Sequence, residues 1–142
     1  NLQSDSNNIR IVNFLNNYLI NYSNTISFDP NFVRNVYAPS LQFYKTRADH
    51  KFIIQEQFQH IERWPDRQYR ILPGSLQSNC TESARRCEVT VILEWVVRSP
   101  ARNSQSVGRA QWQLTLQIDG PRIQIVEEDG QTLDRKISKL RQ

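Results

Sequence analysis

The segment RAQWQLTLQIDGPRIQI, residues 109–125, carries the clearest structural pattern of the chain. Apolar residues occupy every second position with polar residues between them, which is typical of a strand with one buried face and one wet face. Asp119-Gly120 is a two-residue hairpin signal, and the alternation resumes after it. The pattern predicts two antiparallel strands joined by a tight turn, the second of which ends at Asp129-Gly130.

Similar patterns precede this hairpin. Residues 87–98 alternate between apolar and polar side chains, residues 67–73 form a shorter run of the same kind, and residues 41–44 suggest one further short strand. Strands that follow one another closely along a chain usually lie side by side in the sheet. We therefore expect the strands after residue 66 to pair as antiparallel hairpins.

Helical spacing of apolar residues occurs only upstream of the long strands. Residues 9–22 repeat apolar side chains at i, i+3, i+4 and i+7, whereas residues 1–8 are polar and are expected to be disordered or a linker. Asp29-Pro30 predicts the start of a second, short helix, because Asp is a good N-cap and Pro fits the first helical position.

A third helix is predicted over residues 47–63. Residues 46–49 match a capping box, in which a hydroxyl and a carboxylate satisfy free backbone donors. Its buried stripe is expected at Ile54, Phe58 and Ile61. Because helices come first and strands last, the sequence predicts an α+β fold, with three N-terminal helices packed on a curved antiparallel sheet in one domain over residues 9–142.

Charge and hydropathy exclude several classes of protein. Lys and Arg number 18 against 14 Asp and Glu, which gives a net charge of +4. The arginines are dispersed, with Arg85-Arg86 as their only adjacent pair, so we expect a solvated basic surface and no specific nucleic-acid site. An anion-binding surface is the weaker alternative. No apolar stretch is long enough for a transmembrane helix.

The chain contains two cysteines, Cys80 and Cys87, in a polar, Ser-rich stretch. Their spacing fits neither a CxxC redox motif nor a zinc site, and no metal or cofactor is predicted. A disulfide across the end of a short hairpin is favoured over two free thiols, because cysteine is normally a buried residue type. This disulfide predicts an oxidising compartment and hence a periplasmic or secreted protein.

The order of elements, with Tyr37-Ala38 opening the first strand and Trp64-Pro65 closing the third helix, resembles the nuclear transport factor 2-like superfamily. Residues 51–70 are similar to bacterial members that lie as C-terminal domains behind a caspase-like peptidase or another exported domain. The resemblance implies a cone-shaped fold, a pocket between the concave face of the sheet and the helices, and a homodimer formed through the outer face of the sheet.

Catalytic relatives such as ketosteroid isomerase carry an Asp base just after the Tyr-Ala of the first strand. Here Tyr37-Ala38 is followed by residues 39–42, PSLQ, which contain no carboxylate. The resemblance therefore implies a non-catalytic accessory domain of a larger or exported bacterial protein, which binds a protein partner or a small apolar ligand. The alternative is a small-molecule isomerase, dehydratase or cyclase that uses the cone pocket, with His50 or a Tyr as the reacting group.

Aromatic residues are the main candidates for a ligand pocket, although an ordinary core would also use them. His50 joins them as the one polar candidate. His60, on the same predicted helix, is interpreted as a partly exposed residue with no catalytic partner. The candidate pocket residues are Tyr18, Tyr22, Tyr37, His50, Trp64, Trp95 and Trp112.

Overall fold

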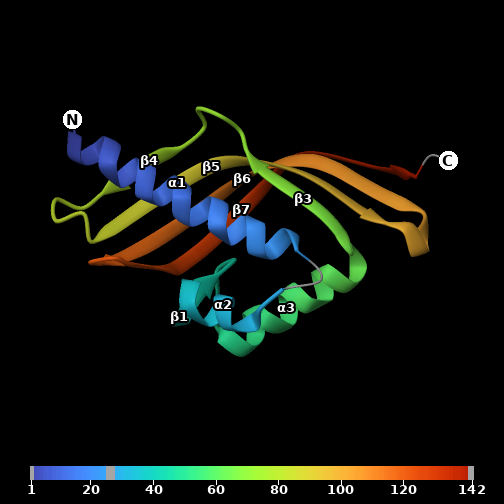
Figure 1. Cartoon of the computed structure of the whole chain (residues 1–142), viewed down its shortest axis with the longest axis horizontal. Coiled ribbons are helices and arrows are strands. Elements are labelled where there is room, and N and C mark those ends of the chain that lie inside the picture. The colour runs from blue at the N-terminus through green and yellow to red at the C-terminus, as the bar shows by residue number, and fades with distance from the viewer. Residues whose placement is uncertain (1, 25–27, 141–142) are drawn as a thin grey trace.

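The computed structural model describes residues 2–24 and 28–140, which form three α-helices and seven strands (Figure 1). The N- and C-termini lie at opposite ends of the long strands. The elements, in chain order, are α1 (Leu2–Ser23), α2 (Pro30–Val36), β1 (Tyr37–Phe43), β2 (Thr46–Asp49), α3 (His50–Arg63), β3 (Asp66–Ile71), β4 (Gln77–Cys80), β5 (Arg86–Ser99), the 3₁₀ turn η1 (Pro100–Arg102), β6 (Ser104–Asp119) and β7 (Arg122–Lys139).

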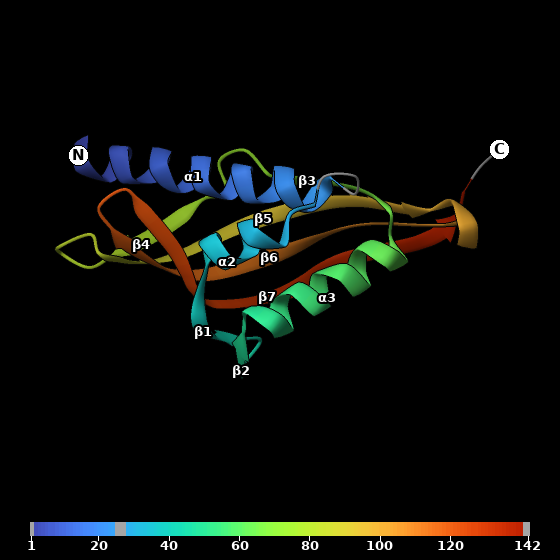
Figure 2. The ribbon, with the colours of Figure 1, turned by 60° about the horizontal axis from the view of Figure 1, so that its bottom comes forward.

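The strands form one sheet in the order β2-β1-β7-β6-β5-β3, with β4 also paired to β5. The α+β class was predicted, but the purely antiparallel sheet is wrong, because β1 pairs with β7 in parallel. This non-local contact joins segments far apart in the chain, so no hairpin signal announces it. Figure 2 shows α1 and α3 running alongside the long strands, with the β1–β2 hairpin at the start of α3.

The two long hairpins follow the predicted alternation. Strand β5 pairs with β6, and β6 pairs with β7 through a turn at Gly120, whose φ of 58° is left-handed. The predicted end of the last strand at Asp129-Gly130 is wrong, since Gly130 pairs with Trp112 and β7 continues to Lys139. Residues 131–139, beyond the predicted end, therefore belong to the sheet.

Strand β7 contains two bulges, which decide the face on which its side chains lie. The register with β6 shifts once after Ile125, so that Val126 is unpaired, and again at Leu133. Each extra residue reverses the alternation of the strand. Before the first bulge Ile125 faces the core, and after it Glu128 does, although the two residues differ in parity.

The N-terminal helix starts earlier than predicted. Helix α1 begins at Leu2, so residues 2–8 are helical although the sequence suggested disorder or a linker. Helix α2 begins at Pro30 after the Asp29 N-cap, as predicted, with the Asn31 N–H donating to the Asp29 carboxylate at 2.9 Å. Within residues 2–24 and 28–140, no helix combines the length and apolar character needed to cross a bilayer.

Helix α3 differs from the prediction at its start and in its buried face. Residues 46–49 form strand β2, and only Asp49 caps the helix, accepting a hydrogen bond from the Phe52 N–H. The buried stripe is Ile53, Gln57 and Ile61, whereas Phe58 is 48% exposed. Gln57 can occupy a core position because a buried partner satisfies its amide. The predicted stripe was wrong because it was chosen from apolar residues alone, and Gln57 is polar.

The core lies between the concave face of the sheet and the helices, and α1 supplies much of it. Ile11 and Leu15 are fully buried against apolar residues of β5, β6 and β7. At the far end of this core, Cys80 is bonded to Cys87, its register partner across the β4–β5 pair. The bond therefore closes the short polar hairpin of residues 81–85.

Candidate functional site

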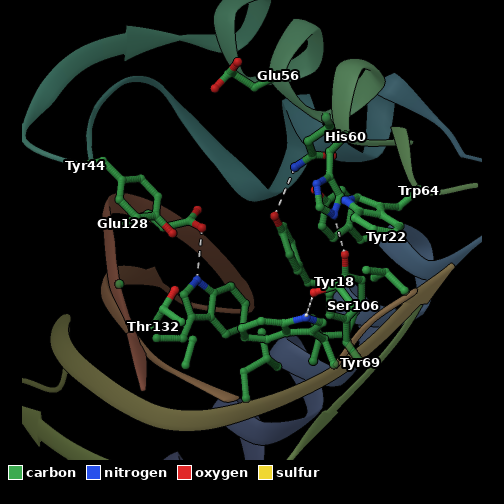
Figure 3. Close-up of a pocket in the computed structure, with 18 of the residues that line it drawn as sticks. Tyr18, Tyr22, Tyr44, Glu56, His60, Trp64, Tyr69, Ser106, Glu128 and Thr132 are labelled. Atoms are coloured by element: carbon green, nitrogen blue, oxygen red, sulfur yellow. Dashed lines mark hydrogen bonds between the residues drawn. The ribbon is translucent and has the colours of Figure 1, made fainter. Parts of the chain in front are cut away.

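A cavity of about 550 Å³ opens between the sheet, α1 and α3 (Figure 3). Nine aromatic residues of the described part of the chain contribute to its wall, and cavities of this size and character commonly hold small ligands. Two hydrogen-bonded polar groups border the cavity, one around Glu128 and the other around His60, and the exposed residues Glu56, Arg63 and Arg135 also line it. The aromatic residues that line it are Tyr18, Tyr22, Tyr37, Phe43, Tyr44, Trp64, Tyr69, Trp95 and Trp112.

Glu128 lies at one side of the cavity, next to the ring of Tyr44 in Figure 3. It is 7% exposed, and its two carboxylate oxygens accept hydrogen bonds from the Tyr37 hydroxyl (2.5 Å) and the Trp112 Nε1–H (3.0 Å). Burial raises the pKa of Glu128 above its ordinary value, while the two hydrogen bonds act in the opposite direction. A buried carboxyl group with a raised pKa in a cavity is typical of a general acid or base.

The hydrogen bonds of Glu128 extend into a buried chain. The Tyr18 and Tyr37 hydroxyls are 2.8 Å apart, and the Gln57 side-chain amide lies 3.0 Å from the Tyr18 oxygen. Burial, followed by the charge of Glu128, raises the pKa of both tyrosines, so they remain protonated and act as neutral donors and acceptors. The residues joined by these hydrogen bonds come from four elements, α1, β1, α3 and β7.

His60 and Tyr69 form the second polar group, across the cavity from Glu128 in Figure 3. The His60 Nε2 and the Tyr69 hydroxyl are hydrogen-bonded at 2.8 Å. Tyr22 stacks on both rings, with centroids 5.5 Å from His60 and 5.3 Å from Tyr69. Burial, assisted by the positive charges of Arg67 and Arg63, lowers the pKa of His60 to about 4, so the imidazole is neutral at physiological pH.

Arg67 supports this second group from beneath. It is 2% exposed, and its guanidinium donates to the Tyr22 carbonyl from Nε (2.9 Å) and Nη2 (2.6 Å). Its Nη1 donates to the Trp64 carbonyl at 2.9 Å. One side chain of β3 thus ties the last turn of α1 to the end of α3, which fixes the stacked rings.

Trp95 lines the cavity, and its indole packs against Gly108 of the neighbouring strand. They are register partners on β5 and β6, and the Trp95 Nε1–H donates to the Ser106 hydroxyl at 3.2 Å. A Cβ atom at Gly108 would lie 2.5 Å from the Trp95 ring. The indole can therefore lie flat over the sheet only because position 108 has no side chain.

We expect the imidazole of His60 to titrate near pH 4 in the folded protein. Its folded-state pKa lies below the ordinary 6.5, so His60 contributes stability that is present above pH 6.5 and is lost as the pH falls toward 4. NMR titration of the ring protons would measure this pKa, with His60→Gln identifying the signal. That variant should also lose less stability than the wild type between pH 6.5 and 4. A midpoint near 6.5 would contradict the expectation.

Six of the seven residues predicted from sequence line the cavity, and His50 does not. The His50 Nε2 instead lies 2.7 Å from the Tyr37 carbonyl and braces β1 against α3. The sequence analysis missed Glu128 and Gln57, and it interpreted His60 as a partly exposed helix residue with no catalytic partner, whereas His60 is hydrogen-bonded to Tyr69. The alternation of residues 67–73 could have indicated Tyr69, since it placed this side chain on a common face with Ile71.

No family model matches the sequence, and no curated protein matches it. Solved structures do match. A scytalone dehydratase-like protein from Novosphingobium aromaticivorans has a TM-score of 0.76 at 10% identity, covering 97% of this chain and 93% of that one. A hexachlorocyclohexane dehydrochlorinase from Novosphingobium barchaimii gives 0.76 at 9% identity, covering 96% and 93%. A nuclear transport factor 2-like superfamily protein from Salmonella enterica gives 0.65 at 10% identity, covering 98% and 94%.

At these identities the comparisons establish the fold: the chain has the nuclear transport factor 2-like cone, as the sequence resemblance implied. The prediction of a non-catalytic accessory domain is wrong. It rested on a missing carboxylate, but Glu128 enters the cavity from β7, and structures with this fold include the dehydratase-like protein and the dehydrochlorinase. The alternative of a small-molecule enzyme agrees better with these findings.

Proposed function

We propose that this protein is a small-molecule enzyme of the lyase or isomerase type, which moves a proton on a neutral cyclic substrate held in the cone. The observation that carries the proposal is the buried carboxyl group of Glu128 in an aromatic cavity, within a network that supplies it with donors. The names of two structural neighbours, a dehydratase-like protein and a dehydrochlorinase, denote elimination reactions and favour the same class.

The two polar groups suit the two ends of an elimination. Ionised Glu128 accepts a proton from a carbon atom, and the electron pair of that C–H bond forms the new C=C bond. The leaving group departs from the adjacent carbon with its own bonding pair and takes a proton from the neutral His60–Tyr69 pair. After product release, exchange with water returns a proton to this pair and removes one from Glu128.

The cavity wall supports a neutral, ring-shaped substrate. Stacked and tilted rings, such as Tyr18 with Trp112 at 5.4 Å, offer flat apolar surfaces. Neither polar group carries a permanent charge, because His60 is neutral and Glu128 gains or loses its charge during the reaction. Glu56, Arg63 and Arg135 also line the cavity, but all three are exposed, so a charged ligand would lose its hydration beside the two buried polar groups.

The proposal can be tested without knowing the natural substrate. A panel of neutral cyclic ketones, alcohols and chlorides would be incubated with the protein in deuterium oxide. Proton NMR would detect exchange at carbon, and ultraviolet absorbance would detect new conjugated double bonds. Catalysed exchange or elimination on at least one binding ligand is expected. Ligands that bind in the cavity but never exchange protons would argue against an enzyme.

We also propose that the protein is periplasmic or secreted, where the bond between Cys80 and Cys87 forms, and that it pairs through the outer face of its sheet. Val107 and its register partner Val96 lie on that face, and Val107 is 39% exposed. Sedimentation at micromolar concentration should show a dimer that Val107→Glu converts to a monomer. Gln113→Glu, an exposed change on the same strand, is the control. A wild-type monomer would contradict the pairing.

A further inference from the structure

Three buried side chains stand in series behind the carboxyl group of Glu128. Gln57, Tyr18, Tyr37 and Glu128 are each at most 7% exposed. The successive separations are 3.0 Å from the Gln57 Nε2 to the Tyr18 oxygen, 2.8 Å between the two hydroxyls, and 2.5 Å to the Glu128 Oε1. Because buried polar atoms that lose their partner are costly, every hydrogen in this chain needs a defined direction.

When Glu128 is ionised, the direction of the chain is fixed. A carboxylate can only accept, so the single hydroxyl proton of Tyr37 points at Oε1. The Tyr37 oxygen must then accept from Tyr18, which has no second proton to give. The Tyr18 oxygen in turn accepts from an N–H of Gln57. All hydrogen bonds run from Gln57 toward Glu128, and the terminal residue must be a donor.

When Glu128 is protonated on Oε1, the same chain of hydrogen bonds must run the other way. A proton on Oε1 faces Tyr37 and leaves the hydrogen bond from the Trp112 Nε1–H to Oε2 in place. Glu128 then donates to Tyr37, Tyr37 donates to Tyr18, and the proton of Tyr18 needs an acceptor at position 57. Rotation of the Gln57 amide by half a turn supplies its carbonyl oxygen at the place of its nitrogen.

We propose that Gln57 is a positioning residue whose amide donates when Glu128 is ionised and accepts when Glu128 is protonated. The buried chain then remains hydrogen-bonded in both halves of a proton-transfer cycle. A primary amide suits this role because it carries a donor and an acceptor of nearly equal size on one pivot. An ionised carboxylate could only accept and an apolar side chain could do neither. The inference rests on the proposed role of Glu128 as the group that takes up the proton.

The surroundings of Glu128 allow the link between its protonation and the orientation of the Gln57 amide to be measured. The tyrosines on which the charge of Glu128 acts are Tyr37 from β1, Tyr18 and Tyr22 from α1, and Tyr44 from the turn between β1 and β2. Burial is the largest cause that raises the pKa of all four, and the charge of Glu128 raises it further, so none of them ionises in the range in which a carboxyl group titrates. Glu56 also lines the cavity and Asp129 follows Glu128 on β7, so a change in these hydrogen bonds is assigned to Glu128 by its absence in Glu128→Gln.

The first measurement uses the unaltered protein. The side-chain carboxyl carbon of Glu128 and the side-chain amide nitrogen of Gln57 would be followed by NMR as a function of pH, with Glu128→Gln and Gln57→Met identifying the two signals. The amide signal of Gln57 should change with the same midpoint as the carboxyl signal of Glu128. An amide signal that stays constant through the titration of Glu128 would overturn the inference.

Two substitutions then separate the effect of hydrogen-bond direction at position 57 from the effect of side-chain volume. Gln57→Glu keeps the size of the side chain but favours the accepting state, so the titration midpoint of Glu128 should rise by ~1 pH unit or more. Gln57→Met keeps the volume but favours neither state, so the midpoint should stay close to that of the wild type. Equal midpoints in the two variants would refute the role of Gln57. These titrations need no substrate, so a failure to find turnover would count against the enzyme proposal alone.

Discussion

Replacing Glu128 with Gln should lower the rate of proton exchange or elimination on a bound ligand by about 10²–10⁴-fold. The amide has the size of the carboxyl group, so the cavity and the ligand affinity should change little. It cannot accept a proton from carbon, so the chemical step loses its base. The rate constant for exchange and the ligand dissociation constant, measured on the same ligand, would separate the two effects.

Glu127→Gln is the matched control, because Glu127 is the neighbouring residue of β7 and is exposed. It removes the same charge without touching the cavity and should leave the rate unchanged. Stability offers an independent check. The folded-state pKa of Glu128 is raised, so its contribution is present at low pH and is lost as the pH rises through that pKa. Glu128→Gln should remove this loss. An unchanged rate in this variant would refute the assignment of Glu128 as the base.

Replacing Trp112 with Ala should lower the free energy of unfolding by about 3–5 kcal/mol. The indole is 5% exposed and lies 5.4 Å from the Tyr18 ring, so its removal leaves a void in the centre of the domain. The substitution also removes the N–H that donates to Glu128, which favours the ionised carboxylate. The pKa of Glu128 should therefore rise further.

Urea denaturation of the wild type and of Trp112→Ala would measure the loss. Trp95→Ala is the matched control, because Trp95 is only half-buried over Gly108 and should cost less. If Trp112→Ala cost less than about 1 kcal/mol, the cavity wall would have to be far more adaptable than its close aromatic contacts imply.

Local patterns predicted the elements of this fold well, and non-local contacts explain the errors. The alternation of residues 109–118 and the N-cap at Asp29 depend on near neighbours, so they can be read from sequence. The parallel pairing of β1 with β7 joins distant segments and leaves no local mark. Likewise, Gln57 is a core residue only because Tyr18, 39 positions away, satisfies its amide.

The candidate site was half predictable. Large aromatic residues indicated a pocket correctly, since six of the named residues line it. Glu128 was missed because a plain alternation continued from Ile125 places Glu127 inward and Glu128 outward. The bulge at Val126 reverses this assignment, and its sequence has no Gly or Pro to mark it. His60 was discounted because its partner, Tyr69, comes from a separate strand.

The two bulges of β7 also bear on how robust the site is to slippage of the strand. They bracket residues 127–132, which pair with residues 110–115 of β6, while Glu127 and Glu128 also pair with β1. A shift of this segment by one position against β6 would place Glu127 or Asp129 opposite Leu114, where Glu128 now stands. All three consecutive residues are acids. A carboxyl group would therefore face the cavity in any of these three registers. The same holds for an insertion in this strand that is compensated by a deletion.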